Sequence, residues 1–207
     1  MLSFPTRSVY MGVNLESSRL MLPTTRLLLA VKRARGKRPR MVATPEPGGT
    51  PPRGGRTARI LASLKGGVRM SNWIAEEWFR QLVVWAYQRR GYVVLLDRHF
   101  IADYYAYDIV GRNRGLSRRL HGFLLWRLYP RPDLVLCLDA PGSLLWKRKG
   151  EGQADLLERR RHEYLRLEQV FPNFHVVDAS RSAPEVARHV ANLIRDFAET
   201  RWRTRSR

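Results

Sequence analysis

The chain has 207 residues and a net charge of +20, with 44% hydrophobic and 27% charged residues, so it is long enough for one α/β domain and its composition excludes a wholly disordered chain. One cysteine, Cys137, excludes a disulfide framework or a cysteine-rich metal site, and no apolar run approaches the ~18 residues of a membrane span. We therefore expect a protein of the reducing cytoplasm with no membrane partner.

Positive charge is concentrated near both ends of the chain. Residues 1–71 contain 14 Lys and Arg against Glu16 and Glu46 alone. Four further arginines follow position 200: Arg201, Arg203, Arg205 and Arg207. Such blocks can bind the phosphates of nucleic acid by releasing counterions, although a solvated basic tail is the commoner explanation. Nucleic acid is therefore the weaker hypothesis for a partner.

The N-terminal part of the chain predicts a strand, a helix and an insertion. Residues 8–11 form a short apolar run that ends at Gly12, and residues 20–34 carry apolar side chains at helical spacing. Residues 36–57 are rich in proline, glycine and arginine and contain too little apolar surface for a packed element. We therefore expect a strand and helix at 1–35 and a main domain at 58–200, separated by an insertion at 36–57 and followed by a basic tail at 201–207.

Strands and helices alternate in the rest of the chain. A helix with an aromatic core face is predicted at residues 72–90 by the spacing of four apolar side chains: Ile74, Trp78, Leu82 and Trp85. Three apolar runs without polar alternation are typical of strands covered on both faces: 92–96, 134–138 and 174–177. Helical patterns separate and follow them: 100–128 with a break near 111–115, 144–170, and 184–202. This order predicts a three-layer α/β fold with a parallel sheet.

An aspartate follows each of these three strands directly, at Asp97, Asp139 and Asp178. The carboxyl ends of parallel strands meet at the ligand-binding edge of a sheet, so these side chains are expected to gather there. Asp178 is also typical of a residue that starts a loop or caps a helix. Arg98, directly after Asp97, is not explained by core packing, and the pair is typical of a site for phosphate and its metal.

A basic segment lies between the last two of these strands. A predicted helix ends at Gly150, and its last residues are Lys147, Arg148 and Lys149. A mobile cationic flap that closes over a transferred phosphate needs such charges and hinges. A helix end whose cations complement its own dipole explains the same residues equally well. Glutamate and arginine at helical spacing in residues 158–163 predict a solvated helix face.

Five segments between residues 95 and 197 resemble thymidylate kinase and its relatives, in the same order. They are LLDRH at 95–99, PDLVLCLDAP at 132–141, RKGE at 148–151, RRHEY at 160–164 and VVDAS at 176–180. Each segment alone is a weak match, but their order makes the resemblance specific for about half of the chain. It implies a P-loop nucleoside-monophosphate-kinase fold, ATP and Mg²⁺ as cofactors, and a nucleotide or another phosphate-bearing small molecule as partner. A homodimer is compatible with it.

The resemblance also implies an acceptor site after the first of the three apolar strands. Asp97 and Arg98 are expected to be catalytic, with Arg98 holding the acceptor's phosphate and Asp97 near the acceptor or the metal. His99, Tyr104 and Tyr107 are expected to contact the acceptor, the two tyrosines by stacking on a base. Aromatic side chains at this helical spacing are more often part of a core.

The resemblance implies a lid and a cofactor site in the later segments. Lys147 and Arg148 are expected to be catalytic lid residues, and Arg148 and Asp178 are expected beside ATP. The family's phosphate loop, G-x-x-x-x-G-K-[ST], does not occur in the sequence, because none of the five lysines precedes Ser or Thr. We therefore expect a kinase body that lacks the family's first strand, phosphate loop and first helix, and that is inactive by itself.

The sequence leaves more than one possibility for the acceptor and for the activity. Relatives carry a small hydroxyl residue and then alanine and an aromatic residue after the Asp-Arg pair, whereas here Ala102 replaces the hydroxyl residue and Ala106 and Tyr107 come one residue late. The acceptor is therefore left as a nucleotide or another phosphorylated or hydroxyl-bearing molecule. Three hypotheses remain: a phosphotransferase body whose true start lies upstream, a non-catalytic relative that acts as a binding module, and a basic nucleic-acid-binding protein on the same scaffold.

Overall fold

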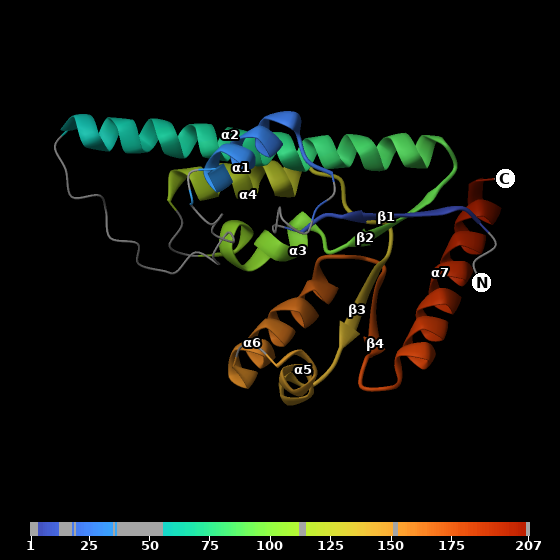
Figure 1. Ribbon diagram of the computed structural model, residues 1–207. Coiled ribbons are helices and arrows are strands. Elements are labelled where there is room, and N and C mark those ends of the chain that lie inside the picture. The colour runs from blue at the N-terminus through green and yellow to red at the C-terminus, as the bar shows by residue number, and fades with distance from the viewer. Residues whose placement is uncertain are drawn as a thin grey trace. The chain divides into compact units, whose positions relative to one another are not determined.

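The computed structural model describes residues 4–12, 18, 20–34, 36, 56–111, 115–150 and 153–205. They fall into two compact units, an N-terminal unit of Phe4–Tyr129 and a C-terminal unit built mainly from Pro130–Arg207 (Figure 1). Residues 37–55 of the predicted insertion lie outside the described residues. In the part of the chain that is described, no helix combines the length and apolar sequence needed to cross a membrane.

The N-terminal unit contains two strands that pair in parallel. Its elements are β1 (Thr6–Tyr10), α1 (Pro23–Ala34), α2 (Arg56–Arg89), β2 (Val93–Asp97), α3 (Phe100–Tyr104), the π-helical turn η2 (Tyr105–Ile109) and α4 (Leu116–Arg127). Thr6 lies opposite Val93 and Tyr10 opposite Asp97. The amide of Met11 donates to the carbonyl oxygen of Asp97, which extends the ladder by one bond. Parallel pairing is therefore confirmed in this unit.

Helix α2 is longer than the sequence pattern predicts and begins at Arg56 instead of residue 72. Its aromatic side chains form the expected contacts, because the ring centroid of Trp78 lies 6.1 Å from that of Trp85 and 5.6 Å from that of Tyr129. The prediction of a core position was wrong for Leu82, which is 57% exposed. The buried stripe of α2 instead includes charged residues, which form the site described below.

Helix α1 is attached to α2 by polar contacts. Pro23 occupies the first position of α1, where a residue without an amide hydrogen loses no helical bond. Before it, the amide of Leu22 donates to Oε1 of Glu76 at 2.9 Å. One turn into the helix, the side-chain amide of Asn72 donates to Oγ1 of Thr25 at 3.1 Å. These bonds fix the start of α1 against the middle of α2.

The C-terminal unit contains the second pair of strands. Its elements are β3 (Val135–Asp139), α5 (Gly142–Lys149), α6 (Ala154–Leu165), the 3₁₀ turn η3 (Arg166–Gln169), β4 (Phe174–Asp178) and α7 (Ala183–Arg205). The strands pair in parallel, and Asp139 lies opposite Asp178. The predicted end of a helix at Gly150 is confirmed, since Gly150 has a φ of +68° and its amide donates to Trp146. The fold is therefore mixed α/β with two two-stranded parallel sheets, and one three-layer sheet remains a prediction.

Candidate functional site

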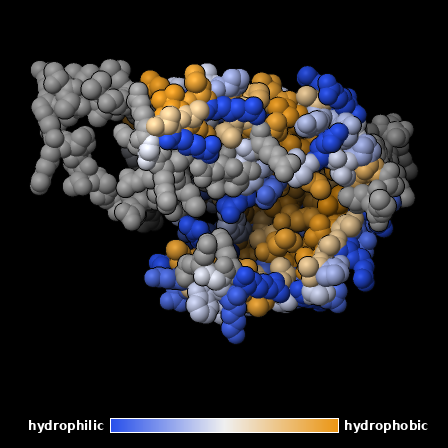
Figure 2. Space-filling view, viewed as in Figure 1, coloured by the Kyte–Doolittle hydropathy of each residue, from blue (hydrophilic) through white to orange (hydrophobic). Residues whose placement is uncertain are grey.

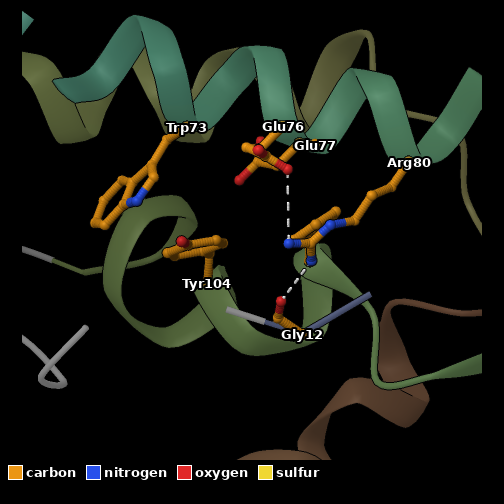
Figure 3. Close-up of a pocket in the computed structure, with 7 residues that line it drawn as sticks. Gly12, Trp73, Glu76, Glu77, Arg80 and Tyr104 are labelled. Carbon is orange, nitrogen blue, oxygen red and sulfur yellow. Dashed lines mark hydrogen bonds and ion pairs between the residues drawn. The ribbon is translucent and has the colours of Figure 1, made fainter. Parts of the chain in front are cut away.

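A small pocket lies in the N-terminal unit between α2, α3 and the end of β1 (Figure 3). Trp73 and Tyr104 lie on one side of it and Arg80 on the other, and the two glutamates of α2 lie between them. The cavity is about 10 Å³, the size of one water molecule, and its lining combines aromatic rings with charged groups. A planar ligand would have to displace Trp73 or Tyr104 to enter it. The lining residues are Gly12, Trp73, Glu76, Glu77, Arg80, Phe100 and Tyr104.

Arg80 and Glu76 are buried in this pocket with hydrogen-bonding groups unused. The Arg80 side chain is 1% exposed, and its Nη1 donates to the carbonyl oxygen of Gly12 at 2.9 Å. Its Nη2 lies 3.8 Å from Oε2 of Glu76, whose side chain is 3% exposed. Among the described residues, no hydrogen bond satisfies Nε or Nη2 of Arg80 or Oε2 of Glu76. Each unsatisfied buried group costs about 1–3 kcal/mol, so these atoms favour a polar molecule that enters the pocket.

His121 on α4 holds the second glutamate of the pocket. The ring is fully buried, with Nδ1 2.7 Å from Oδ2 of Asp108 and Nε2 3.1 Å from Oε1 of Glu77. Burial alone would lower the pKa of His121, but the hydrogen bonds to Asp108 and Glu77 and their charges outweigh burial and raise it to about 9. Arg118 also donates to Asp108 at 2.8 Å. At neutral pH an imidazolium therefore fixes Glu77 at the pocket wall.

Tyr104, a predicted acceptor contact, lines the pocket. Its ring centroid lies 6.3 Å from that of Trp73 and 4.7 Å from the perpendicular ring of His121. Burial, with the charge of Glu77, raises the pKa of Tyr104 well above its ordinary value, so the phenol stays protonated. Tyr107, the other predicted aromatic contact, is half-buried in η2 and does not belong to the pocket lining.

Arg98 lies beside this pocket at the end of β2. Its φ is +68°, a left-handed conformation that costs a residue with a side chain about 1–2 kcal/mol. Its side chain passes close to Gly12, since a Cβ on Gly12 would lie 2.8 Å from Cδ of Arg98. The guanidinium is 53% exposed, with Nη1 3.8 Å from Oδ1 of Asp103. The structure thus places a partly solvated cation next to a residue of the pocket wall.

The neighbours of Arg98 have different surroundings. Asp97 is exposed at the last position of β2. His99 is buried, and its Nδ1 accepts a hydrogen bond from the amide of Ile101 at 3.2 Å, which caps the start of α3. A polar side chain that satisfies a free amide at a helix start is a structural role, so the cap explains His99 without a ligand.

In the C-terminal unit, the two predicted cofactor residues meet at the loop after β4. Arg148 donates to the carbonyl oxygens of Ala179 and Ser180 at 2.6 and 3.0 Å. Asp178 accepts from the amide and the hydroxyl of Ser180 at 2.9 and 2.5 Å. Lys147 is exposed one residue before Arg148 on α5. Arg148 and Asp178 therefore hold the backbone of this loop, in agreement with the loop-starting interpretation of Asp178.

Asp139 is bound by Arg161 of α6, a residue that the sequence pattern assigned to a solvated face. Nε and Nη2 of Arg161 donate to the two carboxylate oxygens at 2.6 and 2.8 Å, and these bonds lower the pKa of Asp139. Nη1 donates to Glu158 at 2.6 Å, and Glu158 accepts from the amide of Gly142 at 2.7 Å. The network fixes α5 and α6 at the carboxyl end of β3, so the solvated-face prediction was wrong for Arg161.

Sequence patterns did not indicate the buried charged residues that form and support the pocket: Glu76, Glu77, Arg80, Asp108 and His121. A helical pattern is read from its apolar positions, and a glutamate four residues before an arginine is usually a solvated pair. One signal was available, because Glu76 and Glu77 lie between Trp73 and Trp78 on a helix with an apolar face.

The residues present fit a phosphate-bearing acceptor better than they fit ATP and Mg²⁺. Within the described ranges, no group of three or more His, Cys, Asp or Glu side chains is arranged to hold a metal ion. Arg148 and Asp178 are engaged with the loop after β4, and the sequence contains no phosphate loop. The exposed guanidinium of Arg98, in contrast, can form charge-assisted hydrogen bonds to a phosphate.

The curated proteins similar to this chain that are described below are all thymidylate kinases or probable thymidylate kinases. No family model matches the chain. The chain is 28% identical over 122 residues to a thymidylate kinase of Thermosipho africanus, which covers 54% of this chain and 59% of that protein. It is 34% identical over 121 residues to a thymidylate kinase of Pseudoalteromonas translucida, and the match covers 52% of this chain and 56% of that protein. It is 31% identical over 117 residues to a probable thymidylate kinase of Thermococcus gammatolerans, and the match covers 50% of this chain and 51% of that protein.

The chain thus spans about half the length of the curated relatives that it matches. The agreement of several relatives supports the resemblance that the Asp-Arg motif and the later segments indicated. Over about half of its length, this chain is similar to thymidylate kinases.

Proposed function

We propose that the chain is the body of a thymidylate-kinase-like phosphotransferase and that its N-terminal unit binds the acceptor. The observation that carries this proposal is the position of Arg98 beside Gly12 of the pocket. An arginine can bind a phosphate through two parallel N–H···O bonds, and aromatic rings such as Trp73 and Tyr104 can cover a base. The acceptor is then a nucleotide or another phosphorylated or hydroxyl-bearing ring compound.

The other predicted site residues receive roles within the same proposal. Asp97, exposed beside Arg98, lies near the acceptor or a metal ion. Lys147 and Arg148 are assigned to a basic lid, and Arg148 and Asp178 would reach the cofactor only by exchanging their bonds to the loop after β4. The meeting of Arg148 and Asp178 at one loop supports their assignment to a common place, although the contacts described here serve the loop itself.

A second candidate is a module that binds the acceptor without transferring phosphate. It is favoured by the sequence of residues 1–207, which contains no G-x-x-x-x-G-K-[ST] loop. Positioning and electrostatic stabilisation of the transferred phosphate supply nearly all catalysis in phosphoryl transfer, and that loop provides much of both in P-loop enzymes. Acceptor binding is common to the two candidates, so it is the property to test first.

The test is calorimetric titration of the protein with thymidine monophosphate, other nucleoside monophosphates and the corresponding nucleosides. We expect a monophosphate to bind more tightly than its nucleoside. Arg98→Ala should weaken monophosphate binding by about 1.5–3 kcal/mol, or about 10- to 150-fold, because it removes hydrogen bonds to a charged group, and should leave nucleoside binding unchanged. Trp73→Ala should weaken both.

The matched control is Arg119→Ala, which removes an exposed arginine of α4 in the same unit. It should leave all affinities unchanged. If Arg98→Ala and Arg119→Ala behave alike, Arg98 is not the phosphate ligand. If no monophosphate binds more tightly than its nucleoside, the acceptor site itself is refuted. Transfer of radiolabelled phosphate from ATP then separates the enzyme from the binding module.

A further inference from the structure

In the described part of the N-terminal unit, most carboxylate side chains are buried and most arginine side chains are exposed. Its described residues include five carboxylates, and four of them have side chains no more than 5% exposed: Glu76, Glu77, Asp103 and Asp108. Only Asp97 is exposed. The negative charge of this unit is therefore largely used inside it, in contacts with Arg80, His121 and Arg118.

Most arginine side chains of this unit whose burial is described are exposed: Arg7, Arg26, Arg33, Arg89, Arg90, Arg98, Arg119 and Arg127. Residues 4–129 contain 23 Lys and Arg against seven Asp and Glu, whereas residues 130–207 contain 15 against 11. With its carboxylates turned inward, the N-terminal unit presents a cationic exterior in the described part of the chain. Such a surface attracts polyanions and binds them with a strong dependence on salt.

One part of this surface combines cations with aromatic rings. It lies where α2 ends and β1 begins, and we call it the Arg7 patch: Arg7, Tyr87, Arg89, Arg90 and Tyr92. The guanidinium carbon of Arg7 lies 5.1 Å from the ring centroid of Tyr92 and 5.9 Å from that of Tyr87, and the two rings are 5.9 Å apart. Figure 2 shows hydrophilic side chains gathered over this end of α2.

The arginines of the Arg7 patch have no internal charge to neutralise. All three are exposed, and none has a carboxylate partner among the described residues. The dipole of α2 favours Arg89 in its last turn, but it does not account for Arg7, which comes from β1. The guanidinium of Arg7 lies beside both tyrosine rings, and Arg89 and Arg90 are exposed in the chain between Tyr87 and Tyr92. Cations and aromatic rings in one place are the combination of phosphate contacts and stacking surfaces that binds single strands.

We propose that the Arg7 patch binds single-stranded nucleic acid. The three arginines contact backbone phosphates, and Tyr87 and Tyr92, with the guanidinium of Arg7 beside them, offer surfaces for bases. The patch is formed by other residues than the acceptor pocket, so the two bind different ligands and either one can fail without the other.

The experiment measures binding of a fluorescent single strand of ~20 nucleotides by anisotropy at increasing salt, with a duplex of equal length as comparison. The test variant is R7Q/R89Q/R90Q. The matched control is R159Q/R166Q/R188Q, which removes the same charge from exposed positions of the C-terminal unit. A third variant, R7K/R89K/R90K, keeps the charge and removes the planar guanidinium groups. Circular dichroism establishes that all variants are folded.

We expect the logarithm of the affinity to fall linearly with the logarithm of the salt concentration. The slope should become shallower by about 2 in R7Q/R89Q/R90Q, because each phosphate contact to a single strand contributes about 0.7. The lysine variant should keep the slope and bind more weakly. Equal slopes for the test and control variants would show diffuse charge and overturn the patch. Equal affinity for the duplex would overturn the single-strand assignment.

Discussion

The buried ring of His121 makes the stability of the N-terminal unit depend on pH in a defined direction. Its pKa is about 9 in the folded unit, against about 6.5 for an unperturbed histidine. Between these values the folded state keeps a proton that the unfolded state has lost, so the free energy of unfolding falls by about 1.4 kcal/mol per pH unit. The contribution is complete below pH ~6.5 and is lost as the pH rises through ~9, about 3 kcal/mol in total.

The perturbation is His121→Gln, which cannot carry the proton. The variant leaves Glu77 buried without its imidazolium partner and Asp108 with Arg118 as its cation. We expect it to be less stable than the natural protein by about 3–5 kcal/mol at pH ~6.5. Its disadvantage should shrink as the pH rises towards ~10, because the natural protein loses the same charge. Tyr104 also faces His121, but its raised pKa keeps it protonated, so it contributes no change in this range. Burial also raises the pKa of Glu77, and any proton that Glu77 loses as the pH rises lowers stability in the same direction as His121.

The assay is urea unfolding followed by tryptophan fluorescence at pH steps from ~6 to ~10, with linear extrapolation of the free energy to water. A charged His121 would be refuted if the free energies of unfolding of the natural protein and of His121→Gln, plotted against pH, differed by the same amount across this range. If the variant does not fold, Asp108→Asn gives a second measurement, since loss of one carboxylate should lower the pKa of His121 and narrow the range in which stability falls.

Three further results are expected. Gly122→Ala should destabilise the N-terminal unit by about 1–3 kcal/mol in urea unfolding, because a Cβ there would overlap the carbonyl oxygen of Asp108. The control Gly67→Ala, inside α2, meets no atom within 4 Å and should not destabilise the unit, since alanine favours a helix over glycine. Arg161→Ala should raise the pKa of Asp139 towards its ordinary value, and NMR titration of the carboxyl carbon would show an unchanged value if the network is unimportant. Residues 1–207 alone should show no transfer of labelled phosphate from ATP. Measurable turnover would contradict the catalytic role given to the G-x-x-x-x-G-K-[ST] loop, which this sequence does not contain.

The strands were predictable because each is a run of apolar residues that ends at a polar one. β2, β3 and β4 lie within one residue of their predicted positions. The start of α2 was not predictable from periodicity, because the pair Gly66 and Gly67 interrupts the apolar pattern, and each glycine costs a helix about 1 kcal/mol that packing must offset. Local sequence carries no information about such packing.

The site was predictable only in part, for a related reason. Arg98 was found because an adjacent acid and base at a strand end have no place in a core. Glu76, Arg80 and His121 were not found, because these buried charges depend on partners from other parts of the chain, here Gly12 after β1 for Arg80 and Asp108 of η2 for His121. Which partner arrives is decided by tertiary structure, and the spacing of residues along one helix does not reveal it.

The π-helical turn η2 contains Ala106 and Tyr107, the two residues that come one position late relative to the thymidylate kinase pattern. Its wide turn is closed by the amide of Val110, which donates to the carbonyl oxygen of Tyr105 at 3.0 Å, five residues back. An additional residue in a regular α-helix would rotate all later side chains by about 100°. A π turn absorbs that residue in one place, so the segments before Tyr105 and after Ile109 keep their faces.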